Sequence, residues 1–323
     1  MNTIINADEY ELYKIIKQNY NFNRADCYIS EIPIEAFVSF RKLLHEDSYF
    51  NWNFCINYAN KCKFAYHIKY KNVNFYVLTD KYITKKSKSH LFNCIYRAYL
   101  VNYLYNIKPY QYINYFILLN PLKRKLPNRK TDMIKAENIN GGFTMINSNN
   151  IYIIRKEDYE KVVLHELLHH NNMIHNDNWK EKNINILKKL CKIEDSQIFI
   201  PNEAIVETFA IILNVIFISI ENNLPYKKIL AKDRKHNIAL AKKIIDRQGN
   251  KLWKEKSHSY CYIVLRAVFY IYFSVFIKSY NVANDNDITA FIVKYFPKII
   301  NKIKRLKDIK KNNSIKQTIF ENF

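Results

Sequence analysis

The sequence predicts an α+β protein in which a lobe with a small mixed sheet precedes a mostly helical lobe. Strand-like and helical patterns mix up to about residue 175, and almost only helical periodicity follows. A chain of 323 residues suits one large unit or two lobes sharing a cleft, and no Gly/Ser-rich or Pro-rich linker divides it. We expect an α+β lobe over 1–175, a helical lobe over 176–308 and a polar tail over 309–323.

The first hundred residues or so contain both kinds of pattern. Apolar residues recur at helical spacing in three segments, 9–18, 34–45 and 91–105. Alternating or β-branched and aromatic residues predict strands at Lys63–Tyr70, Val73–Thr79 and Tyr112–Leu119. The first two strands should form a hairpin about Lys71 and Asn72.

The next segment predicts a strand-turn-strand-helix unit. Gly141 and Gly142 form the one Gly pair in a chain with 3 Gly, which indicates a need for backbone freedom. Strands are expected at Phe143–Ile146 and Ile151–Ile154, and a helix with a large apolar surface at Lys156–Asn171.

Five further helices are expected, at Trp179–Cys191, Pro201–Ile220, Pro225–Gln248, Ser257–Tyr280 and Asp287–Leu306. Two apolar stretches within them, 204–220 and 261–277, could suggest membrane spans, although each is short for one. The first contains Glu207 and Asn214, and the second contains Arg266 near its middle. Because such polar groups are costly in lipid, we expect buried core helices and no membrane span.

The composition is that of a folded protein with a strongly basic balance. The net charge of +22 would fit nucleic acid or an anionic membrane as a partner. The lysines are scattered, however, and abundant Asn, Ile, Lys, Tyr and Phe with few Gly and Pro are typical of an AT-rich genome. We expect no specific nucleic-acid partner, and the sequence specifies no oligomeric state.

The cysteines indicate a reducing compartment. None of the 6 Cys forms a C-x-x-C pair, and the first ten residues lack the basic and apolar regions of a signal peptide. We expect a cytoplasmic location, which would be the host cytoplasm if the protein is viral.

The string HELLH at residues 165–169 is the main chemical signal in the chain. Residues i and i+4 lie on one helix face, so His165 and His169 can both point imidazoles at one zinc ion. Glu166 is rotated by about 100° and is close enough to take a proton from water at the metal. The pattern predicts a catalytic zinc site with Glu166 as general base.

A catalytic zinc site needs a third protein ligand, for which two candidates compete. Glu203 and Glu207 lie at i and i+4 on a later helix, so one could ligate while the other contacts a zinc-bound His. Alternatively, both could be solvated acids near a helix start. The second candidate is His175, because its spacing from the HELLH string matches that of metzincins, although no Met-turn follows.

With Glu203 as ligand, the strings HELLH and NEAIVE resemble the gluzincin class of HExxH zinc metallopeptidases. The resemblance implies a zincin-like lobe with an active-site helix, zinc held by His165, His169 and Glu203, a base at Glu166 and a second acid at Glu207. Glu207 stands where the class usually has Asp. The resemblance also implies a peptide or protein substrate.

Residues 140–155 resemble the strand region ahead of the helix in HExxH proteins encoded by large DNA viruses. The likeness covers residues 140–210 or so. If it holds, one of the two strands at 143–146 and 151–154 would be a sheet edge at which an extended substrate could pair.

An oxyanion donor is expected from the helical lobe, and Tyr260 is favoured over Tyr262, His258 and His236. The function predicted is that of a zinc-dependent metallopeptidase, with endopeptidase and exopeptidase action both open. Two other functions remain as alternatives. One is a zinc amidase with a non-protein substrate, and the other is a basic nucleic-acid-associated protein in which HELLH is structural.

Overall fold

The computed structural model describes residues 4–46, 53–105, 112–145, 148–172, 179–306 and 312–320. The chain forms two compact units, each assembled from separate segments. The helical unit contains residues 1–15, 125–135 and 172–319, and the sheet unit contains residues 16–124, 136–171 and 320–323. The α+β class expected from the sequence is confirmed. Each unit is discontinuous in sequence, and the chain passes from the sheet unit to the helical unit between residues 171 and 172.

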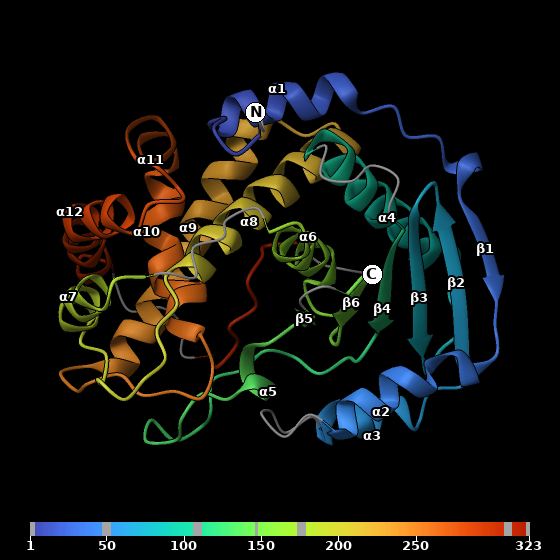
Figure 1. Ribbon diagram of the computed structural model, residues 1–323, viewed down its shortest axis with the longest axis horizontal. Coiled ribbons are helices and arrows are strands. Elements are labelled where there is room, and N and C mark those ends of the chain that lie inside the picture. The colour runs from blue at the N-terminus through green and yellow to red at the C-terminus, as the bar shows by residue number, and fades with distance from the viewer. Residues whose placement is uncertain are drawn as a thin grey trace. The chain divides into compact units, whose positions relative to one another are not determined.

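The sheet unit is built on six strands (Figure 1): β1 Tyr28–Glu31, β2 Phe64–Tyr70, β3 Val73–Thr79, β4 Ile113–Leu118, β5 Gly142–Thr144 and β6 Asn150–Ile153. Their order is β1-β2-β3-β4-β6-β5. The pairs β3–β4 and β4–β6 are parallel, whereas β1–β2, β2–β3 and β5–β6 are antiparallel. The sheet is therefore mixed, and β5 is the last strand at one edge.

One row of rings crosses this sheet and fixes its register. His67, Tyr76, Phe116, Tyr152 and Phe143 stack in that order, one from each of β2, β3, β4, β6 and β5, with centroid spacings of 4.8, 5.1, 5.6 and 4.9 Å. Directly opposed side chains on neighbouring strands stabilise a pairing, and a slip of one residue would send a ring to the other face. The short strand β5 is thus held in place by Phe143 as well as by its backbone.

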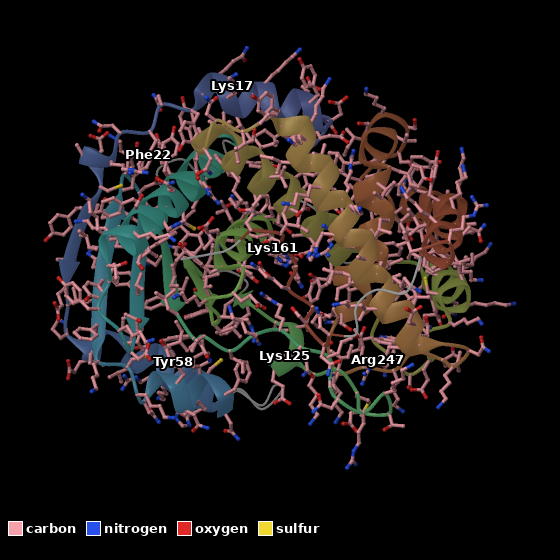
Figure 2. The ribbon with its side chains drawn as sticks, turned by 180° about the vertical axis from the view of Figure 1, so that it is seen from behind. Lys17, Phe22, Tyr58, Lys125, Lys161 and Arg247 are labelled. Atoms are coloured by element: carbon pink, nitrogen blue, oxygen red, sulfur yellow. The ribbon has the colours of Figure 1, made fainter. Side chains whose placement is uncertain are left out.

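The helices of the sheet unit are α2 Val38–Glu46, α3 Asn53–Ala59, α4 Lys85–Tyr105, α5 Ala136–Ile139 and α6 Tyr159–His170, with 3-10 turns η1 Arg24–Asp26 and η2 Ile34–Phe37. Helix α4 packs on β2 and β3, α6 packs on β5 and β6, and the two helices contact each other. Helices α2 and α3 share an apolar cluster with strand residues such as Leu78 and Leu118. Tyr58 of α3, labelled in Figure 2, donates a hydrogen bond of 2.7 Å to Asp80.

The helical unit contains α7 Glu181–Cys191, α8 Asn202–Glu221, α9 Tyr226–Gln248, a π-helical turn η3 Cys261–Leu265, α10 Arg266–Ile271, α11 Phe273–Ser279 and α12 Asp285–Lys304. Helix α1 Glu9–Asn19 begins in this unit. Helix α8 is its core and contacts α9, η3 and α10. The single helix expected over 257–280 is broken near Tyr272, where the axis bends by 75°. At the break, Tyr272 packs on Tyr295 and Phe273 packs on Phe209.

Among the described residues, α8 is long and apolar enough by composition to span a membrane, as is the bent helix pair 261–279 if it is taken as one span. In the fold, 89% of the apolar window of α8 is buried. This burial is that of the core helix expected from the sequence.

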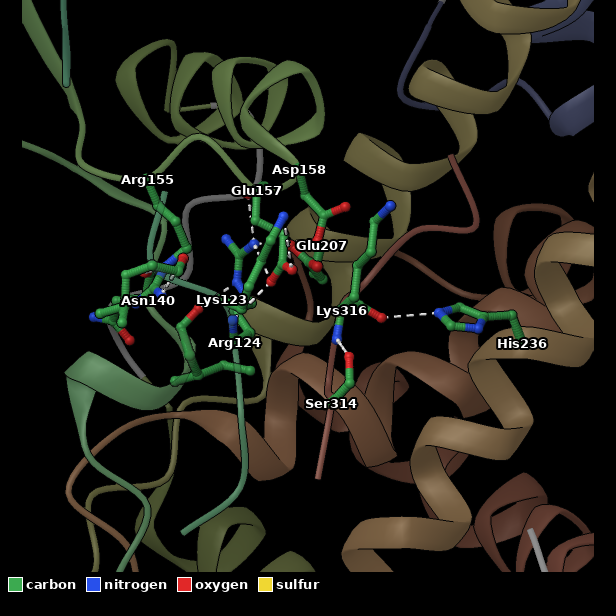
Figure 3. A network of polar contacts seen from close by, with 12 residues as sticks. Lys123, Arg124, Asn140, Arg155, Glu157, Asp158, Glu207, His236, Ser314 and Lys316 are labelled. Carbon is green, nitrogen blue, oxygen red and sulfur yellow. Dashed lines mark hydrogen bonds and ion pairs between the residues drawn. The ribbon is translucent and has the colours of Figure 1, made fainter. Parts of the chain in front are cut away.

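The segment expected as a polar tail contains buried residues. Ile315, Gln317 and Thr318 are at most 3% exposed. The imidazole of His236 donates a hydrogen bond of 2.8 Å to the carbonyl of Lys316 (Figure 3), and the amide of Leu126 donates to the carbonyl of Asn313 at 2.8 Å. Residues 312–319 are therefore part of the helical unit.

Candidate metal centre

The helix that carries HELLH is fixed at its start by a buried arginine. Asp158 precedes α6 in the left-handed conformation, and its carboxylate accepts a hydrogen bond of 3.1 Å from Nη1 of Arg124 instead of capping the helix. Nη1 also donates to the carbonyl of Glu157 at 2.6 Å, and Nε donates to the carbonyl of Ile139 at 2.7 Å (Figure 3). The carboxylate of Glu157 accepts from the Arg124 amide at 2.7 Å. Arg124 thus ties the first residues of α6 to α5.

A second buried arginine completes this network. Arg155 donates from Nε, Nη1 and Nη2 to the carbonyls of Asn140, Leu122 and Glu137 at 3.0, 2.9 and 2.8 Å. Burial and the nearby charge of Arg124 lower the pKa of Arg155 to about 9. Each of the three nitrogens has a backbone partner, so the side chain holds the chain ahead of β5, including α5, in one conformation.

An ion pair fixes α6 to α4. Glu160 accepts hydrogen bonds from Arg97 at 2.7 Å and His90 at 3.2 Å, and both Glu160 and Arg97 are buried. Burial raises the pKa of Glu160, but the charge of Arg97 and the hydrogen bond from His90 outweigh it, so the pKa lies below the ordinary 4.5. The pair contributes to the orientation of α6 through its first turn.

The two neighbouring glycines allow α6 to approach β5. A Cβ on Gly142 would lie 2.7 Å from the carbonyl oxygen of Tyr152 and 2.9 Å from a methyl of Val162, and one on Gly141 would lie 2.2 Å from Nη2 of Arg124. These distances are far below normal contact. The expected role of the Gly pair is therefore refined, because close packing rather than a positive φ requires glycine here.

The two histidines of HELLH face each other. Nε2 of His165 lies 3.1 Å from Nε2 of His169, and the ring centroids are 4.7 Å apart. Two nitrogens that bind one tetrahedral zinc ion at about 2.0–2.1 Å lie about 3.3 Å from each other. The pair is therefore already spaced to hold one ion.

Glu166 is held between α6 and the edge strand. Its carboxylate Oε2 lies 3.0 Å from the hydroxyl of Thr144, which is also 3.2 Å from the backbone oxygen of Glu166. A Cβ on Gly142 would come within 3.0 Å of Cγ of Glu166. Thr144 and Gly142 together define the position of this carboxylate, and the sequence pattern alone did not single out Thr144.

Glu203 lies in the first turn of α8 in the helical unit and is partly exposed. Burial first, and then the charges of Glu255 and Glu203, raise the pKa of the Cys261 thiol well above its usual range. The positive end of the helix dipole favours an ionised carboxylate at this position. The carboxylate of Glu203 therefore lies close enough to η3 to affect Cys261.

Glu207, one turn further along α8, is in a buried ion pair. Its Oε1 accepts a hydrogen bond of 2.9 Å from Nη1 of Arg266, and both residues are at most 1% exposed. Glu207 was expected to contact a ligating His, and the ion pair with Arg266 was not predicted from the sequence.

Tyr260 is also buried, and its hydroxyl donates to the carbonyl of Cys191 at 3.2 Å. Burial raises its pKa well above the usual range. This position gives Tyr260 a packing role and does not support its expected role as an oxyanion donor. His175 lies outside the described residues.

No family model matches this chain, and comparisons with curated proteins and with solved structures give no significant match.

Proposed function

We propose that this protein is a zinc-dependent metallopeptidase in which His165, His169 and Glu203 bind the ion and Glu166 is the general base. The observation that carries the proposal is the distance of 3.1 Å between the Nε2 atoms of His165 and His169 on a rigidly fixed helix. A pair of imidazoles on one helix face with an adjacent glutamate is the arrangement that HExxH zinc metallopeptidases use.

The third ligand in the proposal is Glu203. His165, His169 and Glu203 offer one ligand atom each, an imidazole nitrogen or a carboxylate oxygen, and this donor set could hold a metal ion. Such a set suits zinc and leaves a fourth position for water or substrate. Carboxylates from a second helix are common third ligands, and Glu203 has the type and helix position for this role.

Zinc, when bound, supplies Lewis acidity and makes water more acidic. Glu166 then takes the proton from water and later passes it to the leaving amine. Thr144 keeps the Glu166 carboxylate at a fixed position, since its hydroxyl lies 3.0 Å from Oε2. An extended substrate pairs with the edge strand β5, which brings its scissile bond next to α6.

The metal site is tested by the zinc content of purified protein, measured by mass spectrometry. We expect about one zinc per chain in the parent, loss of zinc in His165→Ala and Glu203→Ala, and retention in Glu166→Gln and His175→Ala. Loss of zinc in His175→Ala with retention in Glu203→Ala would assign the third ligand to His175. A folded parent without zinc would contradict the proposal.

The hydrolytic step is tested with a peptide library analysed by mass spectrometry. Replacement of Glu166 by Gln keeps the size of the side chain and removes the base, so we expect the rate to fall by about 10²–10⁴-fold with zinc retained. A parent that binds zinc and cleaves only non-peptide amides would instead be a zinc amidase.

A further inference from the structure

The edge strand β5 presents different chemistry on its two faces. Gly142 and Thr144 face α6, since a Cβ on Gly142 would meet Val162 and the hydroxyl of Thr144 lies 3.0 Å from Oε2 of Glu166. Successive side chains of a strand point to opposite faces, so Phe143 points to the other face of the sheet. All three residues of β5 are partly exposed, whereas three of the four residues of the neighbouring strand β6 are buried.

Phe143 is the member of the five-ring row that stands on this edge strand. Its ring stacks on that of Tyr152 at 4.9 Å with 20° between the planes, and Tyr152 stacks on Phe116 at 5.6 Å with 21°. These distances are close to the strand separation of about 4.7–4.9 Å, so the row advances by one ring at each strand. A strand added beyond β5 would place one of its side chains at the next step, opposite Phe143.

This position is close to the proposed base. Thr144, the residue after Phe143, is the one that contacts the Glu166 carboxylate, and all of these residues belong to the sheet unit. A strand rises about 3.3 Å per residue, so a peptide residue opposite Phe143 is about one residue from the peptide residue opposite Thr144. The ring therefore lies within reach of substrate positions next to the scissile bond.

We propose that Phe143 binds an aromatic side chain of a peptide substrate paired with β5, at a position within about two residues of the scissile bond. This inference rests on the proposed function, because it requires cleavage beside α6. It names the preferred substrates as peptides with Phe, Tyr or Trp at that position. Phe143 is thus a specificity-determining residue, and the substrate ring continues the row already present in the sheet.

A position-scanned peptide library tests the preference with the zinc-bound parent. Each position within two residues of the cleaved bond carries Phe, Tyr, Trp or Leu in turn, and kcat/KM is measured by mass spectrometry. Leucine is the comparator because it is also large and apolar but has no ring to stack. At one position we expect the aromatic peptides to be cleaved about two- to tenfold faster than the leucine peptide. Equal rates at every position would overturn the inference.

Three variants locate the effect. Phe143→Leu removes the ring and should bring the ratio of aromatic to leucine peptides close to one, whereas Phe143→Tyr keeps a ring and should keep the ratio. Phe116→Leu is the matched control, because it makes the same change in the same row but on β4, two strands from the edge. It should lower stability and leave the ratio unchanged. A ratio that persists in Phe143→Leu, or that falls equally in Phe116→Leu, would overturn the assignment to Phe143.

A binding measurement separates selection from chemistry. The Glu166→Gln protein lacks the base, and stacking on Phe143 needs no turnover, so this protein should retain the aromatic peptides better than the leucine peptide by a similar ratio. Equal retention would overturn the inference. A zinc-bound parent that cleaves peptides without an aromatic preference would overturn this inference alone, whereas a folded parent without zinc would overturn the peptidase proposal and this inference with it.

Discussion

The buried arginines of the two units differ in how fully their hydrogen bonds are used. In the sheet unit, Arg155 donates from all three nitrogens to backbone carbonyls, and Arg124 holds Asp158 and the Glu157 carbonyl at the start of α6. In the helical unit, Arg266 donates from Nη1 to Glu207, and its Nε and Nη2 have no hydrogen-bond partner in the part of the chain that the structure describes. Arg155 holds backbone segments together, whereas Arg266 holds one buried carboxylate of α8. All three side chains are nearly fully buried, so burial alone does not distinguish an arginine that holds the backbone from one that forms a side-chain ion pair.

The largest effect on stability is expected from breaking the network of hydrogen bonds around Arg124. Arg124→Met removes the cation beside Glu157 and Asp158 and leaves buried carboxylates without it, which should cost about 3–5 kcal/mol of unfolding free energy. Urea denaturation measures this loss. Lys123→Ala serves as control, because Lys123 is 62% exposed and 3.8 Å from Glu157, and its exposed pair should contribute about 0–1 kcal/mol. Equal losses in the two variants would contradict the scaffold role of Arg124.

For the ion pair of Glu207 and Arg266, the free energy of unfolding should fall more when one partner is replaced than when both are. Glu207→Gln alone leaves a buried arginine without its counter-charge and should cost about 3–5 kcal/mol. The double variant Glu207→Gln/Arg266→Met removes both charges and should be clearly more stable than Glu207→Gln, because an unsatisfied buried cation is gone. A double variant no more stable than the single one, by urea denaturation, would show that Arg266 is needed for the fold itself.

A smaller effect tests how closely α6 is held against β5. Gly142→Ala puts a methyl group 2.7 Å from a backbone oxygen, and we expect a cost of about 1–3 kcal/mol and a lower zinc content, since α6 must shift. Gly249→Ala is the control. Its φ of 60° strains the backbone, but no atom lies within 4 Å of the added Cβ, so zinc content should not change. Full zinc in Gly142→Ala would mean that α6 tolerates the displacement.

The smallest effect is a difference in pH dependence. The folded-state pKa of Glu160 lies below 4.5, so its ionised form stabilises the fold above that pH, and the contribution is lost as the pH falls below 4.5 towards the folded-state pKa. Glu160→Gln should therefore lose stability less steeply with acid than the parent. Denaturation curves collected across this pH range give the slope of the unfolding free energy against pH for each protein. Parallel slopes would contradict the stabilising role of ionised Glu160.

Local patterns in the sequence predicted most of the helices and strands. The hairpin β2–β3 turns at Lys71, which has a φ of 53°, and α9 begins after Pro225 and ends before Gly249, as turn and breaker signals indicate. The facing histidines of HELLH follow from helical spacing alone. Helix α3 and strand β1 were not predicted because both are short. The break at Tyr272 was not predicted because no Gly or Pro lies at that position.

The contacts that give individual residues their roles could not be predicted in the same way. Arg266 lies 59 positions from Glu207, and Thr144 lies 22 positions from Glu166. Nothing in the sequence around Thr144 distinguishes it from a packing residue, and although Arg266 and Glu207 each stand out as charged residues in an apolar stretch, the sequence does not pair them. Such pairings depend on which elements the fold brings together, and a single sequence contains no record of them.

The discontinuous units have a consequence for how the chain folds during synthesis. Glu9 pairs with Arg234 and its carbonyl accepts a hydrogen bond from Tyr226, so the segment around Glu9 finds these partners only after more than two hundred further residues are made. The sheet unit needs residues only as far as 171 for its strands and helices, whereas the helical unit needs the buried residue Ile315. Nascent chains should therefore contain a formed sheet while the N-terminal segment still lacks its partners, a state that invites binding by chaperones.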